Sequence, residues 1–283
     1  SLAATLGGAV RCVLIEAEDQ PGYHATGRSA AFWSETYGGP AVQPLTSASG
    51  SYLDSHGFLL PRSELAIAQA GDEPLLDAFV AEFAGSGVAL ERHDRPALEA
   101  RIPGLRPDWQ SGVGEPSCRD IDVAGLHAYY LALARRAGVG LLCGARVQSL
   151  ERANGRWTVA TSAGPVEAAV LVDAAGAWAS NVAAMASAAP IAITPYRRTV
   201  VQLQVEPGAA ADMPLVMDIA GRCYFKPEVG GRIWVSPHDE TASPPCDAAP
   251  EEIDVAIAID RFEKMVDWRV VKRERAWAGV RSF

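Results

Sequence analysis

Acidic and small residues near the amino terminus have the types and spacing of a nucleotide-binding site. Glu16 ends the short apolar run 12–15, which is typical of a buried parallel strand. An acid at the carboxyl end of such a strand accepts hydrogen bonds from the ribose hydroxyls of a dinucleotide, in the crevice where these sheets bind ligands. We therefore predict that Glu16 and the adjacent Ala17 contact the ribose.

The next segment, 22–31, is rich in small residues and reads GYHATGRSAA. Small residues let a backbone approach a ligand closely, and a hydroxyl beside backbone N–H groups at the start of a helix suits a phosphate. The residues predicted to contact the cofactor in this segment are Gly27, Arg28, Ser29 and Ala30.

A second apolar run, 170–176, ends in small residues and leads into a predicted helix from Trp178. It indicates another strand-to-helix crossing aimed at the nucleotide, with Ala175, Gly176 and Trp178 near the cofactor. The glycine fingerprint that cradles a pyrophosphate is expected about 20 residues before the ribose acid. That position lies before Ser1, so we expect the first strand and its glycine loop to precede the sequence shown.

Three polar side chains farther along the chain have the chemistry to bind a small acid. Arg281 lies near the end of a predicted strand, and a planar guanidinium with two prongs suits a carboxylate. Tyr224 lies on another predicted strand, and His238 follows a third. From residue type alone, a surface position for Arg281, a packing role for Tyr224 and a turn position for His238 stay open.

Three stretches of the chain resemble the FAD-dependent oxidoreductases of the D-amino acid oxidase, glycine oxidase and sarcosine oxidase group. They are VLIEAEDQPGYHATGRSAAFWSETYG at 13–38, LVDAAGAWA at 171–179 and WAGVRSF at 277–283. The resemblance covers nearly the whole chain and implies that the cofactor is FAD. It also implies a carboxyl-terminal segment that closes over the flavin, which would begin just after Phe283.

The resemblance implies roles for single residues of this sequence. In the family, an arginine at the position of Arg281 takes the substrate carboxylate, and a tyrosine at the position of Tyr224 binds the same group in glycine oxidase-like members. His238 falls where the family's sheet meets the flavin edge. Arg28 and Ser29 match cofactor contacts, and Val147 is expected to bind adenine through its main chain.

The implied reaction is hydride transfer to the flavin from the carbon that carries the amine of a small amino acid, of the D-amino acid, glycine or N-methyl amine type. Water then hydrolyses the imine to the oxo acid, and the electron acceptor stays unidentified. A hydroxyglutarate dehydrogenase-like enzyme acting on a 2-hydroxy acid is the closest alternative, and it needs a histidine base such as His238 or His24. A binding protein without flavin is the third possibility.

Composition narrows the function further. The net charge of −9 argues against nucleic acid and anionic membranes as partners. Five widely spaced cysteines without a C-x-x-C pair, and no apolar run of about 18 residues, predict a cytoplasmic enzyme without a membrane span. The sequence has no H-x-x-x-H or other metal-ligand cluster and no G-x-S-x-G, so neither a metal site nor a serine hydrolase is predicted.

Hydrophobic periodicity predicts an α/β fold with a second, mainly antiparallel β-sheet domain of the α+β type. The family resemblance implies that the first is a Rossmann-like FAD-binding domain and the second a substrate domain. We assign 1–56, 120–185 and 270–283 to the cofactor domain, and 57–119 and 186–269 to the substrate domain. We expect helices over 32–54 (broken at 38–40), 72–84, 95–102, 121–137 and 250–266. The segments 57–62 and 65–68 are predicted to pair as two strands. Further strands are expected over 139–144, 145–150, 156–161, 166–168, 170–176, 194–205, 214–219, 223–236 (a hairpin) and 272–283.

Overall fold

The computed structural model describes residues 1–282, so Phe283 of the WAGVRSF segment lies outside the described part. A small parallel sheet joins β1 (Val13–Ile15) to β8 (Gly140–Leu142), and α1 (Leu2–Leu6) packs against α5 (Val123–Arg136). These elements confirm the predicted strand 12–15 and helix 121–137. The side chain of Asp122 caps α5 by accepting from the backbone N–H of Gly125 at 2.8 Å.

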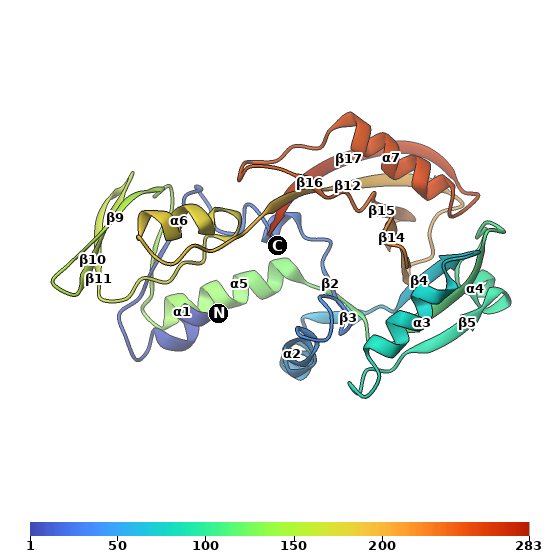
Figure 1. Ribbon diagram of the computed structural model, residues 1–283, viewed down its shortest axis with the longest axis horizontal. Helices are drawn as coiled ribbons and strands as arrows, with labels where there is room; N and C mark the ends of the chain where they lie inside the picture. Colours follow the sequence, from blue (N-terminus) through green and yellow to red (C-terminus); the bar gives the residue numbers. More distant parts are fainter. Residues whose placement is uncertain (283) are drawn as a thin grey trace.

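A three-stranded meander lies at one end of the molecule in Figure 1. It comprises β9 (Val147–Ala153), β10 (Arg156–Thr161) and β11 (Gly164–Ala168). Asn154 and Gly155 between the first two strands both have positive φ, at 52° and 75°, which is the conformation that a two-residue hairpin turn requires. The predicted meander is therefore confirmed.

The predicted strand 170–176 is wrong. The chain from 169 to 175 forms no strand, and Val170 and Val172 are 75% and 60% exposed. A strand needs a hydrogen-bonded neighbour, and this segment pairs with none within residues 1–282. It leads into a short 3-10 helix, η2 (Gly176–Trp178), and then into α6 (Ala179–Met185), so the predicted helix after it is confirmed.

A nine-stranded sheet dominates the other end of the molecule (Figure 1). Its order is β16-β12-β15-β14-β13-β4-β6-β5, with β17 on β12, and all pairs are antiparallel except β13 with β4. The strands are β4 (Glu64–Gln69), β5 (Glu91–Asp94), β6 (Trp109–Glu115), β12 (Pro195–Glu206), β13 (Leu215–Asp218), β14 (Tyr224–Glu228), β15 (Arg232–Ser236), β16 (Thr241–Ala242) and β17 (Arg269–Ser282).

Helices cover this sheet on both faces. The main core lies where α7 (Glu252–Glu263) and α4 (Arg95–Arg101) pack on one face, with the rings of Phe225 and Phe262 5.1 Å apart. The side chains of β4 alternate, so Leu65 and Ile67 enter this core while Ala66 and Ala68 face α3 (Glu73–Glu82) on the other side.

The predicted inward faces of two helices need correction. The apolar spacing in 72–84 and 250–266 predicts that Leu75 and Ile253 face the core, but Leu75 of α3 is 43% exposed and Ile253 of α7 is 60% exposed. The residues of α7 that are buried against the sheet are Val255, Ala258 and Phe262. Helical periodicity predicts that an apolar stripe exists, but the sheet decides which residues at its margin are covered.

A fourth sheet, β2-β7-β3, lies with α2 (Gln43–Ser55) between the large sheet and the part of the molecule that contains α1 and the meander. Its strands are β2 (Phe32–Trp33), β3 (Leu59–Pro61) and β7 (Arg119–Ile121). The helix predicted over 32–54 therefore begins only at Gln43, because Gly38 and Gly39 take positive φ values of 93° and 78° and end any regular structure there.

The predicted pairing of 57–62 with 65–68 is also wrong. Strand β3 pairs with β7, and β4 pairs with β6 and β13, so the two neighbours in sequence join different sheets. Strand β17 also has a neighbour that the sequence did not predict. It pairs with β12 from Ser282↔Pro195 to Arg269↔Glu206, so residues 270–282, which were assigned to the cofactor domain, lie in the large sheet.

Within residues 1–282, no helix has both the length and the apolar character to cross a bilayer.

Candidate active site

Three strands of the large sheet place polar side chains on the face opposite α7. Arg197 bonds Asp254 of α7 at 2.9 Å, and Phe225 packs on Phe262, so both point toward that helix. Because side chains alternate along a strand, their neighbours Arg198 and Tyr224 point to the other face.

Arg281 reaches the same face from β17. In the register of β12 with β17, Arg198 lies opposite Gly279 and Arg281 lies opposite Tyr196, which makes the two arginines diagonal neighbours. The predicted residues Tyr224 and Arg281 are thus brought together. Arg198 was missed, and the signal was present: of two successive arginines on a strand, one must face away from the helix that the other binds.

Arg198 is a buried cation beside a second cation. Its side chain is 9% exposed, its Nε donates to the carbonyl of Asp239 at 2.9 Å, and its Nη2 bonds Glu240 at 3.0 Å. Burial and, after it, the charge of Arg281 lower the pKa of Arg198. Two guanidinium groups so close together make this face attractive to an anion.

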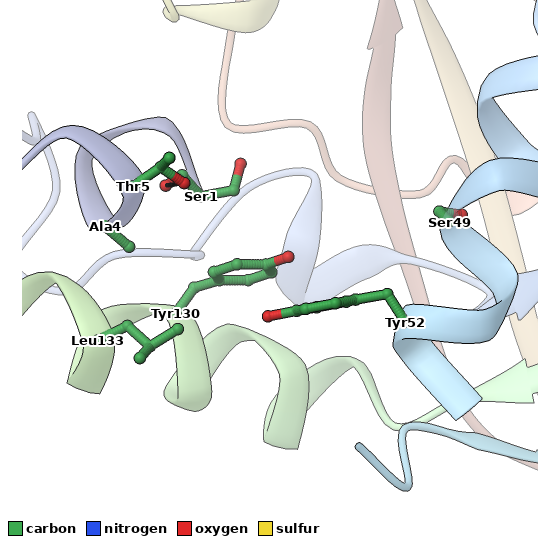
Figure 2. Close-up of a pocket in the computed structure, with 7 residues that line it drawn as sticks. All are labelled: Ser1, Ala4, Thr5, Ser49, Tyr52, Tyr130 and Leu133. Carbon is green, nitrogen blue, oxygen red and sulfur yellow. Dashed lines mark hydrogen bonds between the residues drawn. The ribbon is translucent and has the colours of Figure 1, made fainter. Parts of the chain in front are cut away.

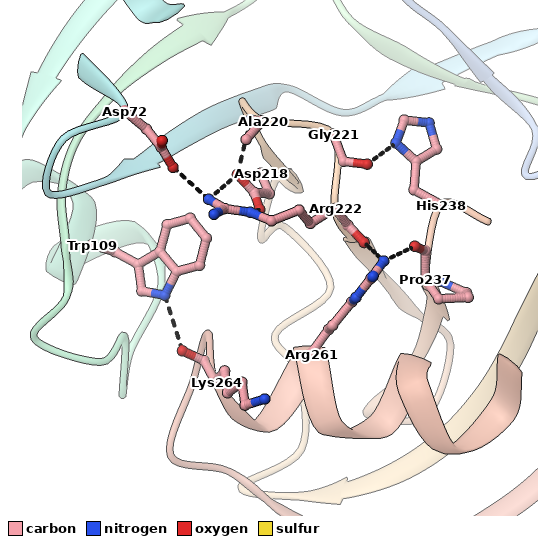
Figure 3. A network of polar contacts seen from close by, with 10 residues as sticks. All are labelled: Asp72, Trp109, Asp218, Ala220, Gly221, Arg222, Pro237, His238, Arg261 and Lys264. Atoms are coloured by element: carbon pink, nitrogen blue, oxygen red, sulfur yellow. Dashed lines mark hydrogen bonds and ion pairs between the residues drawn. The ribbon is translucent and has the colours of Figure 1, made fainter. Parts of the chain in front are cut away.

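His238 follows β15 and lies against Tyr224, with ring centroids 5.8 Å apart in an edge-on arrangement. Its Nδ1 is 2.8 Å from the carbonyl oxygen of Gly221 (Figure 3). Burial, and then the charge of Arg198, lower the pKa of His238 to about 4. The neutral ring therefore donates from Nδ1 to the carbonyl, which leaves Nε2 as a hydrogen-bond acceptor.

The loops around His238 are held by Arg261 of α7, whose Nη1 donates to the carbonyls of Arg222 and Pro237 (Figure 3). Asp218 binds Arg222 in the same network and accepts from the backbone N–H of Ala220 at 2.9 Å. His238 has a φ of 54°, a value that a non-glycine residue keeps when its surroundings hold it there. The network accounts for the fixed position of the imidazole.

Aromatic rings border the arginines. The guanidinium carbon of Arg281 lies 5.3 Å from the ring centroid of Tyr37, and Phe32 lies 5.4 Å from Tyr37 and 6.3 Å from Tyr224, centroid to centroid. Burial raises the pKa of Tyr224 to about 12, so its hydroxyl is a neutral donor. Tyr37 was not predicted as a site residue, although it lies in the first family-like stretch, one residue before its end.

Glu16, the predicted ribose acid, lies where expected, at the carboxyl end of β1. Its backbone N–H donates to Leu142 of β8, and its carbonyl accepts from Ala145, both at 2.8 Å. Its Oε1 accepts from the backbone N–H of Glu18 at 3.0 Å. A carboxylate has about four acceptor positions, so Glu16 retains capacity for the two hydroxyls of a ribose.

The small-residue segment 22–31 contains a 3-10 turn, η1 (Thr26–Arg28). A Cβ at Gly27 would lie 2.7 Å from the carbonyl oxygen of Gly22, so this tight turn requires glycine. Ser29 Oγ accepts from the backbone N–H of Ala31 at 3.0 Å and stabilises the exit from the turn. Ala30 lies between these two residues.

Arg28 ties this segment to the large sheet. Its Nη1 donates to the carbonyls of Ala278 at 3.0 Å and Ala248 at 3.1 Å, and its Nη2 forms an ion pair with Asp247. The Cβ of Arg28 lies 3.3 Å from the position of a Cβ built on Gly279, two residues before Arg281. The predicted cofactor contact of Arg28 stays a prediction, and the structure adds an anchoring role that the sequence did not suggest.

The remaining predicted cofactor residues lie close to the same segment. The rings of His24 and Trp178 are 4.7 Å apart, which brings 22–31 against η2, the element that also contains Gly176 and follows Ala175. Glu18 bonds His24 at 3.0 Å and Arg146 at 3.6 Å, and Arg146 immediately precedes Val147 at the start of β9. The structure thus gathers the predicted cofactor residues around the end of β1.

A separate cavity of about 380 Å³ lies between α1, α2 and α5 (Figure 2). Hydroxyl groups and aromatic rings border it, and none of the predicted site residues does. Its lining residues are Ser1, Ala4, Thr5, Ser49, Tyr52, Tyr130 and Leu133.

The residues around the end of β1 fit an FAD molecule by their chemistry. The carboxylate of Glu16 suits the adenosine ribose, and the small residues of 22–31 suit close approach of a ligand to the backbone. This group meets the arginine face at Gly279, so a cofactor held here lies next to the substrate residues.

Comparisons with known proteins agree with this architecture. The family described as "FAD dependent oxidoreductase" (DAO) matches residues 1–283. A curated relative from Bos taurus, "FAD-dependent oxidoreductase domain-containing protein 1", is 28% identical over 138 residues. That match covers 42% of this chain and 27% of the length of the relative.

Solved structures show the same fold. Glycine oxidase from Geobacillus kaustophilus has a TM-score of 0.83 at 18% identity, over 99% of this chain and 78% of its own. L-proline dehydrogenase from P. horikoshii has a TM-score of 0.84 at 20% identity, and the match covers 99% of this chain and 77% of that one. L-alpha-glycerophosphate oxidase from Mycoplasma pneumoniae, with FAD bound, has a TM-score of 0.87 at 16% identity, over 99% of this chain and 79% of that one.

The predicted mixed α/β fold is therefore confirmed, and the possibility of a binding protein without flavin is set aside. The three similar structures are named for an amino acid oxidase, an amino acid dehydrogenase and a glycerophosphate oxidase, so the fold does not choose among substrates. The family match spans every residue of the sequence. The chain belongs to the FAD-dependent oxidoreductase family, and its cofactor is FAD.

Proposed function

We propose that this protein oxidises a small amino acid at the carbon that carries both the amine and the carboxylate. The observation that supports this most is the placement of Arg198 and Arg281 on one sheet face, next to Tyr224 and His238. Two cations, a neutral phenol and a neutral imidazole acceptor match an anionic group with a hydrogen-bond donor beside it.

The protein residues have separable roles in this proposal. Arg281 binds the substrate carboxylate, with Arg198 behind it adding positive charge and Tyr224 donating a hydrogen bond. His238 Nε2 accepts a hydrogen bond from the amine and so fixes which face of the carbon is presented. Phe32 and Tyr37 exclude water from the reacting carbon.

The cofactor residues are Glu16, Ala17, Gly27, Arg28, Ser29, Ala30, Val147, Ala175, Gly176 and Trp178, as predicted from the sequence. FAD supplies the acceptor for the hydride and its two electrons when it is bound. The protein supplies orientation, since a fixed carboxylate sets the substrate carbon at one place in the site. Water hydrolyses the imine product to the 2-oxo acid and releases its nitrogen as ammonia or, from an N-methyl substrate, as methylamine.

The direct test is the visible spectrum of the purified full-length protein during anaerobic addition of D-amino acids, glycine, sarcosine and 2-hydroxy acids. We expect oxidised flavin bands that bleach with an amino acid. Bleaching by no compound of the panel would contradict the proposed substrate class and leave the family assignment intact.

A 2-hydroxy acid is the second candidate, since Nε2 of His238 is an acceptor placed beside the arginines. Alcohol oxidation needs a base for the hydroxyl proton, and a histidine with a pKa of about 4 is a weak base at neutral pH. An amino acid bound with a neutral amine needs no base, so the lowered pKa favours the amine substrate. Bleaching by hydroxy acids alone would reverse this preference.

The domain division and the location are also proposals. We assign 1–56 and 120–185 to FAD binding, and 57–119 and 186–269 to substrate binding, with β17 contributing Arg281 to the site from within the large sheet. The cytoplasmic location stays a prediction from the sequence, and the electron acceptor stays unidentified.

A further inference from the structure

A buried carboxylate outside the sites described so far holds the segment that carries Tyr37. Glu115 ends β6 and is 2% exposed. It accepts five hydrogen bonds, four from the segment 34–36 just before Tyr37 and one from Ser117, two residues after it in the chain. The donors are Ser34 Oγ at 3.0 Å, Glu35 N at 2.7 Å, Thr36 N at 3.2 Å, Thr36 Oγ1 at 2.6 Å and Ser117 Oγ at 3.2 Å.

The arrangement requires a carboxylate and not an amide. The backbone N–H of Glu35 donates to Oε1, while the backbone N–H of Thr36 donates to Oε2. A hydroxyl can turn and become an acceptor, but a backbone N–H cannot. A glutamine at 115 would therefore point its NH2 group at a fixed donor in either orientation and lose at least one of these bonds.

The segment 34–36 is also held by side-chain contacts besides those to Glu115: Ser34 Oγ lies 3.1 Å from Thr36 Oγ1, and Glu35 Oε1 accepts from Ser47 Oγ of α2. It follows the two-residue strand β2 and precedes Gly38 and Gly39, whose positive φ values break regular structure. Its local backbone bonds are weak, with Tyr37 N to Ser34 O at 3.4 Å and Gly39 N to Thr36 O at 3.2 Å. Glu115 accepts both backbone N–H groups immediately before Tyr37, those of Glu35 and Thr36.

We propose that Glu115 is a positioning residue for the active site, which acts by holding 34–36 so that the ring of Tyr37 lies against Arg281. The inference rests on the proposed function, because Arg281 is the residue assigned to the substrate carboxylate. Releasing the segment lets Tyr37 leave the guanidinium and changes substrate binding without a direct contact between Glu115 and substrate.

Glu64 provides a control for the backbone contacts: its side chain interacts with that of Ser34, whereas the N–H groups of Glu35 and Thr36 donate to Glu115. It lies directly opposite Glu115 in the β4–β6 register and is 3% exposed, and its Oε2 has no hydrogen-bond partner in the part of the chain that the structure describes. Burial, and then the charge of Glu115, raise the pKa of Glu64 to about 8. At neutral pH Glu64→Gln replaces one neutral side chain by another of the same shape.

The test compares Glu115→Gln with Glu64→Gln in the FAD-loaded protein, using the substrate that reduces the wild-type flavin fastest. We expect Glu115→Gln to raise KM about tenfold, the scale of one lost hydrogen bond to a buried charge, with a smaller change in kcat. Glu64→Gln should keep the wild-type KM. Equal KM values for Glu115→Gln and the wild type would overturn the proposal.

A double-mutant cycle with Tyr37→Ala separates positioning from a general structural effect. If Glu115 acts through Tyr37, Glu115→Gln changes KM less than twofold once the ring is gone. Effects that multiply in the double variant would overturn the proposal. Should Glu115→Gln fail to fold, Thr36→Val removes one of the five bonds and must raise KM in the same direction; an unchanged KM would count against Glu115.

Amide hydrogen exchange gives a readout that needs no substrate. We expect the peptide covering 32–37 to exchange faster in Glu115→Gln than in Glu64→Gln, because the N–H groups of Glu35 and Thr36 lose a buried acceptor. Unchanged exchange would overturn the proposal. If no acid in the panel reduces the wild-type flavin, the proposed function fails, and this exchange measurement still decides the role of Glu115.

Discussion

The two halves of the proposed active site, the cofactor region and the arginine face, are built in different ways. The cofactor region, around the end of β1, is made of short continuous stretches in which small residues allow close backbone approach, as in the turn at Gly27. The arginine face of the large sheet is made of single side chains from distant strands, and Arg198 and Arg281 meet through the pairing of β12 with β17. A local motif thus specifies the cofactor region, whereas sheet register specifies the substrate region.

Removing a charge from the arginine face should have the largest effect. We expect Arg281→Ala to lower kcat/KM about 100-fold, since truncating one partner of a buried charge pair costs about 2–5 kcal/mol. FAD content should stay at the wild-type level. Arg275→Ala is the matched control, because Arg275 lies on the same strand but packs on Trp277 and bonds Gln202. Loss of FAD in Arg281→Ala would show that the two halves are not separable.

The reciprocal change is in the cofactor region. Glu16→Gln should weaken FAD binding about tenfold, as expected when a charged hydrogen-bond acceptor becomes neutral, and leave KM unchanged at saturating FAD. Flavin fluorescence during titration of the apoprotein measures the affinity. Glu18→Gln is the control, since Glu18 binds His24 and Arg146 instead. Equal losses in both variants would contradict a specific ribose contact for Glu16.

Two buried groups make opposite contributions to the dependence of stability on pH. The raised pKa of Glu64, about 8, means that the folded state binds its proton more tightly, so this stabilisation is full below about 4.5 and is lost as pH rises to about 8. The lowered pKa of His238, about 4, gives stability that is full above about 6.5 and is lost as pH falls to about 4.

Denaturant unfolding at several pH values separates these two contributions. Between pH 6.5 and 8, Glu64→Gln should remove a fall in unfolding free energy of up to about 1.4 kcal/mol per pH unit. Between pH 6.5 and 4, the wild-type unfolding free energy loses the contribution of His238 as the pH is lowered, with a similar slope. His238→Asn should remove this loss. Identical pH profiles for Glu64→Gln and the wild type would mean that Glu64 is not protonated in the folded protein.

The smallest expected effect is at the junction of the two regions. A Cβ added by Gly279→Ala would lie 3.3 Å from the Cβ of Arg28, which is tight enough to displace the 22–31 segment slightly. We expect a loss of about 1 kcal/mol in stability, the low end for overpacking, with small changes in both FAD affinity and KM. A change in one parameter without the other would show that the regions move independently.

Where the sequence analysis succeeded, local pattern carried the information. The helix over 121–137 has a capping aspartate, the meander has its Asn154-Gly155 turn, and Glu16 ends an apolar run. It was wrong where an element depends on distant neighbours. The run 170–176 is apolar yet forms no strand within residues 1–282, and β3 and β4 are adjacent in sequence yet join different sheets.

Local composition is sufficient to predict a cofactor region, because tight turns and a terminal acid act through the residues next to them in the chain. The arginine face and its tether are set by pairing across long sequence separations. Arg198 and Tyr37 gain a role when β12, β17 and the segment after β2 meet, and Glu115 gains its five donors when β6 reaches 34–36. Hydrogen-bond register between strands, and not residue type, decides which side chains share that space.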